Sequence, residues 1–211
     1  MNKNYKIKKL RKKDYIKFYN SLKDARNNNS HGIYVLLRDP EVYKYTQNFL
    51  MGNAIAGFAI EPNGELISIH KNTTKANSAK VSHVLPLLVK TAFKHGADRG
   101  DCYGDFLASY YASCGFLPVA IVPFDNLDDN PATWDTSKFG KPNCYILARA
   151  VKNNNELKKL KKSNKLLNLS EIEPYVKRFS NYEDALKYRD NLLTLFKGVN
   201  YLTIVDYIKR H

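Results

Sequence analysis

Tyr111 is the residue whose spacing most directly suggests chemistry. It begins a Tyr111-x-x-x-Gly115-Phe116 pattern, in which a predicted helix over residues 106–114 ends at a glycine and a strand follows at once. Glycine readily adopts the left-handed conformation that ends a helix, so this spacing fixes a phenol near a helix terminus and beside a strand edge. A phenol held there could donate a proton. It could equally be one more buried aromatic on the apolar face of a helix.

Two histidines and two aspartates are further candidates for acid–base or binding roles. His70 and His83 could accept a proton from an ammonium substrate, because imidazole titrates near neutral pH. A lone histidine is also consistent with a structural or surface role. Asp101 and Asp105 lie around a predicted strand–helix junction, where they could orient a substrate or serve as turn and N-cap residues, Asp105 being the N-cap.

The loop over residues 125–135 combines several aspartates with Trp134, the only tryptophan in the chain. Acidic side chains beside an aromatic ring could receive an amine, or the loop could be a surface segment anchored by one indole. Cys102, Cys114 and Cys144 lack a Cys-x-x-Cys spacing and are expected to be reduced, inert thiols. No spacing in the sequence is typical of a metal site, and no metal is expected.

The elements that must position these residues form a strand-rich central region. The link Pro62-Asn63-Gly64 joins two apolar stretches and predicts a tight hairpin. In the second of these stretches, regular alternation places Leu66, Ser68 and His70 on one face. We predict strands over residues 32–37, 45–50, 54–60, 65–70, 99–103, 116–124 and 143–150, and a helix that ends at Lys94.

Both flanks are predicted to be helical. Apolar residues recur on one stripe over residues 10–26, with Asp14 as the expected N-cap. Residues 151–170 read as a linker that leads into or contains a basic helix. A Ser180-x-x-Glu183 capping box begins another helix that ends at Gly198, and residues 202–208 form a last helix or strand. We therefore divide the chain into a basic N-terminal extension (1–30), a central domain (31–150), and a basic linker with a C-terminal helical extension (151–211).

The net charge of +14 belongs to these flanks. Residues 1–30 carry ten Lys and Arg against two Asp, and residues 151–180 carry eight against three, whereas residues 31–150 are neutral. Clustered cations could bind nucleic acid or an acidic protein, or could simply form solvated faces. No apolar run is long enough to span a bilayer and no signal peptide is visible, so we expect a cytoplasmic protein with no membrane partner. The short C-terminal segment could pack on the central domain or on a second copy of the chain, as in a homodimer.

Over residues 32–150 this order of elements resembles the GNAT superfamily of acyl-CoA-dependent N-acetyltransferases. The resemblance rests on the strand pair AGFAIEPNGELISIHK, the helix after it, and the Tyr-x-x-x-Gly-Phe segment that follows a short strand. It implies an α/β (α+β) fold, with a GNAT-like mixed, mostly antiparallel central sheet flanked by helices. The segment after Phe124 also resembles GNAT-like proteins that are associated with phage genomes.

The resemblance implies acetyl-CoA as the cofactor and assigns residues to it. In GNAT proteins the strand that corresponds to residues 65–70 splays from its neighbour, so Ile67, Ser68, Ile69 and His70 would line the slot for the pantetheine arm. The family's glycine-rich phosphate loop is absent, since no glycine lies between Gly64 and Gly96. Side chains around the next helix start would replace it: Lys75, Ser78, Lys80, Ser82 and His83.

In such an enzyme Tyr111 would be the acid that protonates the leaving thiolate of CoA, and of the two possible bases His70 is assigned to the catalytic site. Asp101, Asp105 and Trp134 would contact the acceptor, a primary amine that the sequence does not identify. The alternative is a catalytically silent GNAT-fold module that binds nucleic acid or an acidic protein through residues 1–30 and 151–180, including a phage structural or host-interaction protein.

Overall fold

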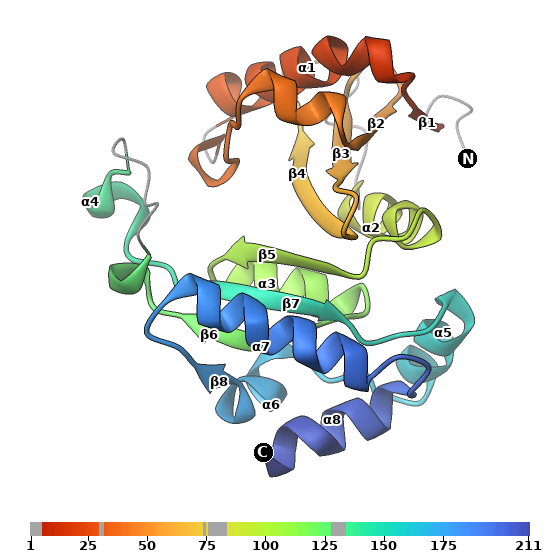
Figure 1. Cartoon of the computed structure of the whole chain (residues 1–211), viewed down its shortest axis with the longest axis vertical. Coiled ribbons are helices and arrows are strands. Elements are labelled where there is room, and N and C mark those ends of the chain that lie inside the picture. The colour runs from red at the N-terminus through yellow and green to blue at the C-terminus, as the bar shows by residue number, and fades with distance from the viewer. Residues whose placement is uncertain (1–5, 30–31, 74, 76–83, 128–133) are drawn as a thin grey trace. The chain divides into compact units, whose positions relative to one another are not determined.

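The computed structural model describes residues 6–29, 32–73, 75, 84–127 and 134–211. Over these residues the chain is a mixed α/β fold whose strands pair mostly antiparallel, which confirms the predicted fold class. None of the described helices is both long and apolar enough to cross a bilayer. Figure 1 labels the strands β1 (Ile7–Lys9), β2 (Gln47–Met51), β3 (Ala56–Ile60), β4 (Glu65–Lys71), β5 (Arg99–Tyr103), β6 (Phe116–Val122), β7 (Cys144–Arg149) and β8 (Lys177–Arg178).

The helices follow the predicted positions closely in the centre of the chain. They are α1 (Tyr15–Asn28), α2 (Val84–Lys94), α3 (Asp105–Ser113), α4 (Thr136–Phe139), α5 (Asn154–Lys162), α6 (Leu169–Ile172), α7 (Tyr182–Leu195) and α8 (Tyr201–Arg210). Short 3₁₀ helices are η1 (Lys12–Asp14), η2 (Gly32–Tyr34), η3 (Pro40–Lys44), η5 (Phe124–Asn126) and η6 (Glu173–Tyr175).

The chain divides into two compact units, Met1–Asp98 and Arg99–His211, and each is described by itself. The boundaries predicted at residues 30 and 150 lie inside these units. As a result, the N-terminal basic helix and the C-terminal helices each share a core with part of the predicted central domain.

In the first unit, β1, β2, β3 and β4 are neighbours in chain order and pair antiparallel. Gly64 ends the predicted hairpin link at a φ of +91°, a conformation that glycine adopts at little cost. Helix α1 packs on the sheet through Phe18 and Leu22, which are fully buried against Ala59 and Ile67. The amphipathic stripe of residues 10–26 is therefore a core-facing stripe.

The strand predicted over residues 32–37 is wrong. Residues 32–34 form η2, and Val35 and Leu37 pack on the core of the first unit from a segment without strand pairing. An apolar run of this length does not distinguish a strand from a loop whose side chains fill a neighbouring core. Gly32 approaches the Arg26 carbonyl so closely that a side chain would have no room.

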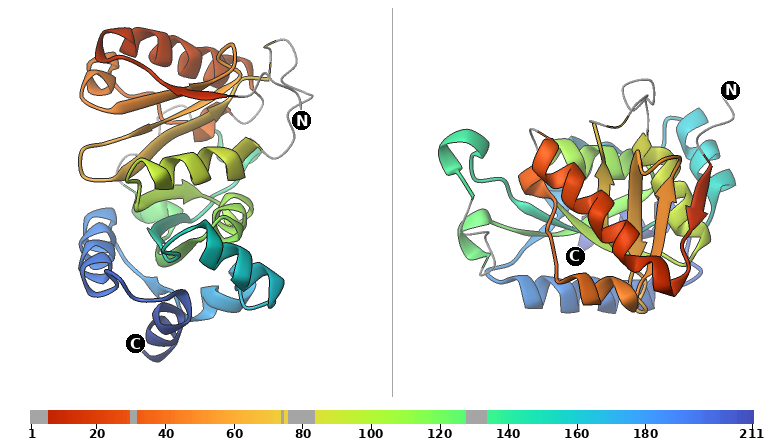
Figure 2. Two further views of the ribbon diagram at one scale, coloured as in Figure 1. Left: turned by 90° about the vertical axis from the view of Figure 1, so that its right-hand side faces the viewer. Right: turned by 90° about the horizontal axis from the view of Figure 1, so that it is seen from above.

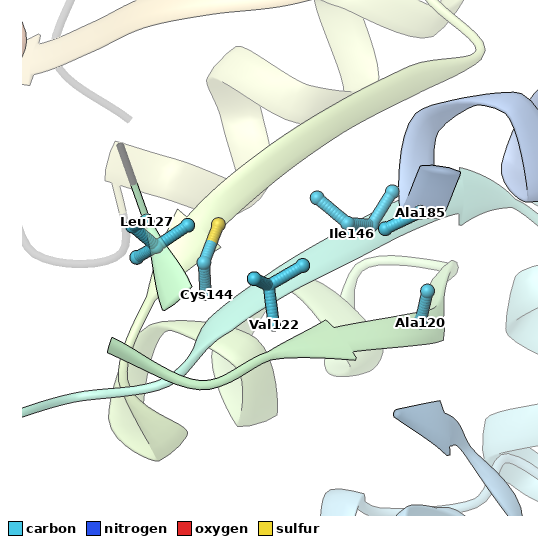
Figure 3. Packing of buried hydrophobic residues seen from close by; sticks show 6 residues of the cluster. All are labelled: Ala120, Val122, Leu127, Cys144, Ile146 and Ala185. Carbon is cyan, nitrogen blue, oxygen red and sulfur yellow. The ribbon is translucent and has the colours of Figure 1, made fainter. Parts of the chain in front are cut away.

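In the second unit, the strand order is β5-β7-β6-β8, with antiparallel pairs except for the parallel pair β6–β8. Helices α3 and α7 cover opposite faces of β5, β7 and β6, as Figure 1 and the turned view in Figure 2 both show. Under α7, alternate residues of β6 and β7 meet Ala185 in a compact apolar cluster (Figure 3). Its buried members are Ala120, Val122, Leu127, Cys144, Ile146 and Ala185.

Helix starts differ from the prediction by one residue at two places. Helix α7 is capped by Asn181, whose side chain accepts from the Asp184 amide, so the predicted capping box at Ser180 is wrong. Helix α3 begins at Asp105 itself, with Gly104 in the N-cap position. The last segment is a helix, α8, and the basic segment after residue 151 contains α5.

The end of α3 offers a test of how tightly the second unit is packed. Gly115 has a φ of +98°, and a Cβ atom there would lie 2.4 Å from Val151 Cγ2. Gly198 has a φ of +81°, and no atom lies within 4 Å of the same position. We expect Gly198→Ala to lower the free energy of unfolding by about 1 kcal/mol from backbone strain alone, and Gly115→Ala by about 3 kcal/mol.

Urea unfolding of both variants measures this difference. In a Val151→Ala background, the cost of Gly115→Ala should fall to that of Gly198→Ala. Equal costs for the two glycine variants in the native background would show that Val151 does not confine this turn.

Candidate functional site

The predicted site residues lie in both units, and the first unit contains Ile67, Ser68, Ile69, His70 and Lys75. Here β4 is not a regular strand. Gly57 of β3 pairs with His70 and Ala59 pairs with Ile67, so Phe58 alone lies opposite two residues, Ser68 and Ile69. We call this pair of residues the β4 bulge. Ser68 has a φ of +54°, which is uncommon for a residue with a Cβ atom.

The β4 bulge changes which side chains share a face. Regular alternation would place Ile67 and His70 on opposite faces, as the sequence predicts. An extra residue shifts the alternation by one. Ile67 lies in the core with Phe18, and His70 bonds to Ser21, so both face α1. Ile67 and His70 are buried, whereas Ser68 and Ile69 are only partly buried. The predicted alternation, in which Ile67 and His70 lie on opposite faces, is therefore wrong.

Hydrogen bonds within the first unit hold the bulge in place. The Ser68 hydroxyl bonds to the Tyr43 hydroxyl at 2.8 Å. The Ser68 carbonyl lies 3.0 Å from His70 Nδ1, and because a carbonyl can only accept, Nδ1 carries the proton. In the neutral ring Nε2 must then accept from the Ser21 hydroxyl, 2.9 Å away. We call Ser21, Tyr43, Ser68 and His70 the bulge network.

The His70 ring is enclosed by this network. It is 3% exposed, and the edge of the ring meets Phe18 with centroids 5.4 Å apart. Burial lowers the pKa of His70 from its ordinary 6.5 to about 4, with a smaller opposing effect from the bond to the Ser68 carbonyl. His70 is thus neutral at physiological pH, and both of its ring nitrogens are engaged. His70 therefore holds the backbone of β4 in place through these two hydrogen bonds.

The residues predicted to bind the phosphates fall mostly outside the described part of the chain. Four of them lie outside the described residues: Ser78, Lys80, Ser82 and His83. The predicted start of the helix at Ser82 lies outside them as well. Lys75 is described, and its ammonium group forms an ion pair with Asp24 at 3.0 Å.

In the second unit, Tyr111 lies on α3 and is 8% exposed. Its ring meets Phe116 edge to face, with centroids 5.8 Å apart, so the Tyr-x-x-x-Gly-Phe spacing brings the two rings together. Burial raises the pKa of the Tyr111 phenol well above 10, with smaller contributions from Cys102 and Asp101. The phenol is therefore protonated at neutral pH and can donate a hydrogen bond.

Asp101 and Asp105 each accept a phenol hydrogen bond on opposite sides of this sheet. Tyr182 of α7 donates to Asp101, on the face away from Tyr111. On the α3 side, Tyr145 lies 2.7 Å from Asp105 and 3.2 Å from Glu173, and burial is the main cause that raises its pKa. Strand alternation therefore separates Asp101 from Tyr111.

Trp134 is held among three aromatic rings, those of Tyr103, Phe124 and Phe139, with centroid distances of 5.8, 5.4 and 5.7 Å. Its indole nitrogen donates to the Gly140 carbonyl at 2.9 Å. The indole thus anchors the chain after β6, and the neighbouring residues 128–133 lie outside the described part.

The three cysteines are buried, and none of them forms a disulfide. Burial raises the pKa of each thiol, that of Cys114 less than those of Cys102 and Cys144. Within the described ranges, no group of three or more His, Cys, Asp or Glu residues could hold a metal ion.

Sequence reasoning missed Ser21, Tyr43 and the bulge itself. Ser21 carried a usable signal, because it is a polar residue between Phe18 and Leu22 on the apolar stripe of α1. The bulge carried none, since neither Ser68 nor Ile69 is a glycine. Neither protein-family models nor curated proteins match the chain.

The bulge network predicts how stability depends on pH. The folded pKa of His70, about 4, lies below the unfolded value near 6.5. Its contribution to stability is complete above pH 6.5 and is lost as the pH falls to 4. We expect this loss to be about 3 kcal/mol.

Urea unfolding at several pH values between 7 and 4 measures it. His70→Gln should remove most of this pH dependence, whereas His95→Gln, at an exposed position, should retain it. An unchanged pH profile in His70→Gln would contradict the assignment of the buried neutral ring.

Proposed function

We propose that the chain is an acyl-CoA-dependent N-acyltransferase that moves an acetyl group from acetyl-CoA to a primary amine by direct attack. The neutral amine attacks the thioester carbonyl of acetyl-CoA, and the bond between this carbon and the sulfur breaks as the new C–N bond forms. CoA leaves as a thiolate, and the proton that the amine loses passes to water. The proposal places the protein in the cytoplasm, because acetyl-CoA is a metabolite of the cell interior.

The single observation that supports this most is the β4 bulge. It falls on the strand that the GNAT resemblance assigns to the pantetheine arm. Bulges are over-represented next to active sites, where they re-aim side chains and interrupt pairing, and strained residues concentrate at functional sites. Here the bulge keeps Ile67 and His70 in the core and leaves Ser68 and Ile69 partly exposed. In this proposal Ser68 and Ile69 contact the cofactor.

The bulge network also refines the role of His70. An imidazole whose two nitrogens are both bonded inside the first unit is poorly placed to take a proton from an incoming amine. His70 therefore acts as a positioning residue, which holds the Ser68 carbonyl and, with it, the left-handed turn of the strand.

Tyr111 can serve as a hydrogen-bond donor to the leaving thiolate, but its raised pKa disfavours complete transfer of the proton. A phenol with a raised pKa keeps its proton at pH 7 and can donate a hydrogen bond to a thiolate. Full transfer to a thiolate with a conjugate-acid pKa near 8.5 is uphill, so Tyr111 contributes by stabilising the negative charge as the bond to sulfur breaks.

Calorimetric titration with acetyl-CoA, paired with thiol release in the presence of a panel of primary amines, tests the proposal. We expect the native protein to bind acetyl-CoA and to release CoA. Tyr111→Phe should bind with an affinity within about twofold but react roughly 10²-fold more slowly, because only the transition state gains from the donor.

Tyr110→Phe is the matched control, since this neighbouring phenol packs near Phe106 and has no assigned role. It should bind and react like the native protein. Absence of binding heat for the native protein would overturn the proposed function. Normal binding with an unchanged rate in Tyr111→Phe would remove Tyr111 from the mechanism and leave the cofactor assignment standing.

A further inference from the structure

Helix α5 carries a row of lysines on its outer side. Lys158, Lys159, Lys161 and Lys162 lie in its last five residues, Lys165 follows just beyond, and all five are exposed. Successive residues turn by 100°, so the four helical lysines fan over one side, with Lys158 and Lys162 one turn apart.

The other side of α5 is used by the protein itself. Leu160 is 7% exposed and Leu157 is half-buried, so the apolar side of the helix is packed on the second unit. Glu156 is occupied as well, because its two carboxylate oxygens accept from the backbone amides of Lys152 and Tyr201 at 2.6 and 3.1 Å. The acidic residue of this helix is thus committed to backbone contacts.

This leaves a concentrated positive surface. In the part of the chain that the structure describes, none of the five lysines forms an ion pair. Like charges at i and i+3 or i+4 on a helix repel each other and lower its stability by a few tenths of a kcal/mol per pair. The favourable position of these cations near the helix C-terminus offsets part of that cost. An external polyanion would relieve the rest.

We propose that the lysine face of α5 binds the phosphate backbone of duplex nucleic acid without sequence preference. Lysine ammonium groups contact phosphates as point charges, and such contacts carry no sequence information. A membrane-binding helix would need a free apolar face to insert, and Leu160 is already buried. A protein partner or single-stranded nucleic acid would favour aromatic or apolar residues at the contact, and the exposed positions here are lysines.

The structure also distinguishes this face from the other basic flank. In residues 6–29, Asp14 pairs with both Arg11 and Lys17, at 2.8 and 3.0 Å. The remaining described cations of this flank are distributed over β1, η1, α1 and the residues between them, so they do not lie together on one helix. Among the described residues of the two basic flanks, α5 is the element that gathers four lysines within its last five residues.

Fluorescence anisotropy of a labelled random-sequence DNA duplex of about 20 base pairs tests the proposal over a series of salt concentrations. Five phosphate contacts predict a slope of log K against log salt of about −4 to −5. A variant with Lys158, Lys159, Lys161 and Lys162 all changed to Gln should bind at least tenfold more weakly, and its slope should fall by roughly 3 to 4.

The control variant changes Lys8, Lys12, Lys13 and Lys23 to Gln, four exposed lysines, so both variants have the same net charge. It should bind the duplex within about threefold of the native protein. Three results would each overturn the proposal. The first is an equal loss of duplex affinity in both variants, and the second is no duplex binding by the native protein. The third is binding to poly-glutamate or anionic vesicles that is as tight as binding to the duplex. The α5 variant should still titrate with acetyl-CoA, so this test is independent of the proposed transferase activity.

Discussion

The geometry of the first unit depends on one backbone conformation, the left-handed turn at Ser68. A residue with a Cβ atom in this region costs about 1–2 kcal/mol. The partly buried hydrogen bonds between the Tyr43 and Ser68 hydroxyls and from His70 to the Ser68 carbonyl offset that cost, at about 1 kcal/mol each. Because these bonds come from η3 and from β4 itself, with Ser21 of α1 fixing the far side of the imidazole, three elements together impose the bulge. Without it, Ile67 and His70 could not both face α1.

The second unit positions its residues by a different constraint, the two-residue period of its strands. Asp101 and Cys102 are adjacent on β5, yet Asp101 accepts a hydrogen bond from Tyr182 of α7, whereas Cys102 makes the larger contribution of the two to the raised pKa of Tyr111 on α3. The helices on opposite faces thus separate two candidate substrate residues, Asp101 and Asp105. Tyr111 belongs with Cys102 and Phe116 in a low-dielectric environment that keeps its phenol protonated, whereas Asp101 is part of the packing of α7.

Much of this fold was predictable because turns and strands over short stretches depend on the residue types within them. The hairpin at Asn63-Gly64 and the strand over residues 99–103 lie where expected, and Gly115 has the positive φ that ends α3.

The prediction failed where tertiary contacts determine the conformation of a segment. Residues 32–37 are apolar enough for a strand but fill the core as a loop, and Asn181 caps α7 in place of Ser180. The edge strands β1 and β8, of three and two residues, are too short for a periodic signal. The position of β4 was predictable but its geometry was not, because Ser68 and Ile69 give no sign of a bulge.

We propose that the β4 bulge presents Ser68 and Ile69 to an acyl-CoA. Hydrogen–deuterium exchange of the native protein, with and without saturating acetyl-CoA, tests it most directly. We expect acetyl-CoA to slow exchange of the backbone amides in residues 67–70 and to leave those of β2, over residues 47–51, little changed. Slowed exchange confined to other segments, with residues 67–70 unaffected by bound acetyl-CoA, would contradict it.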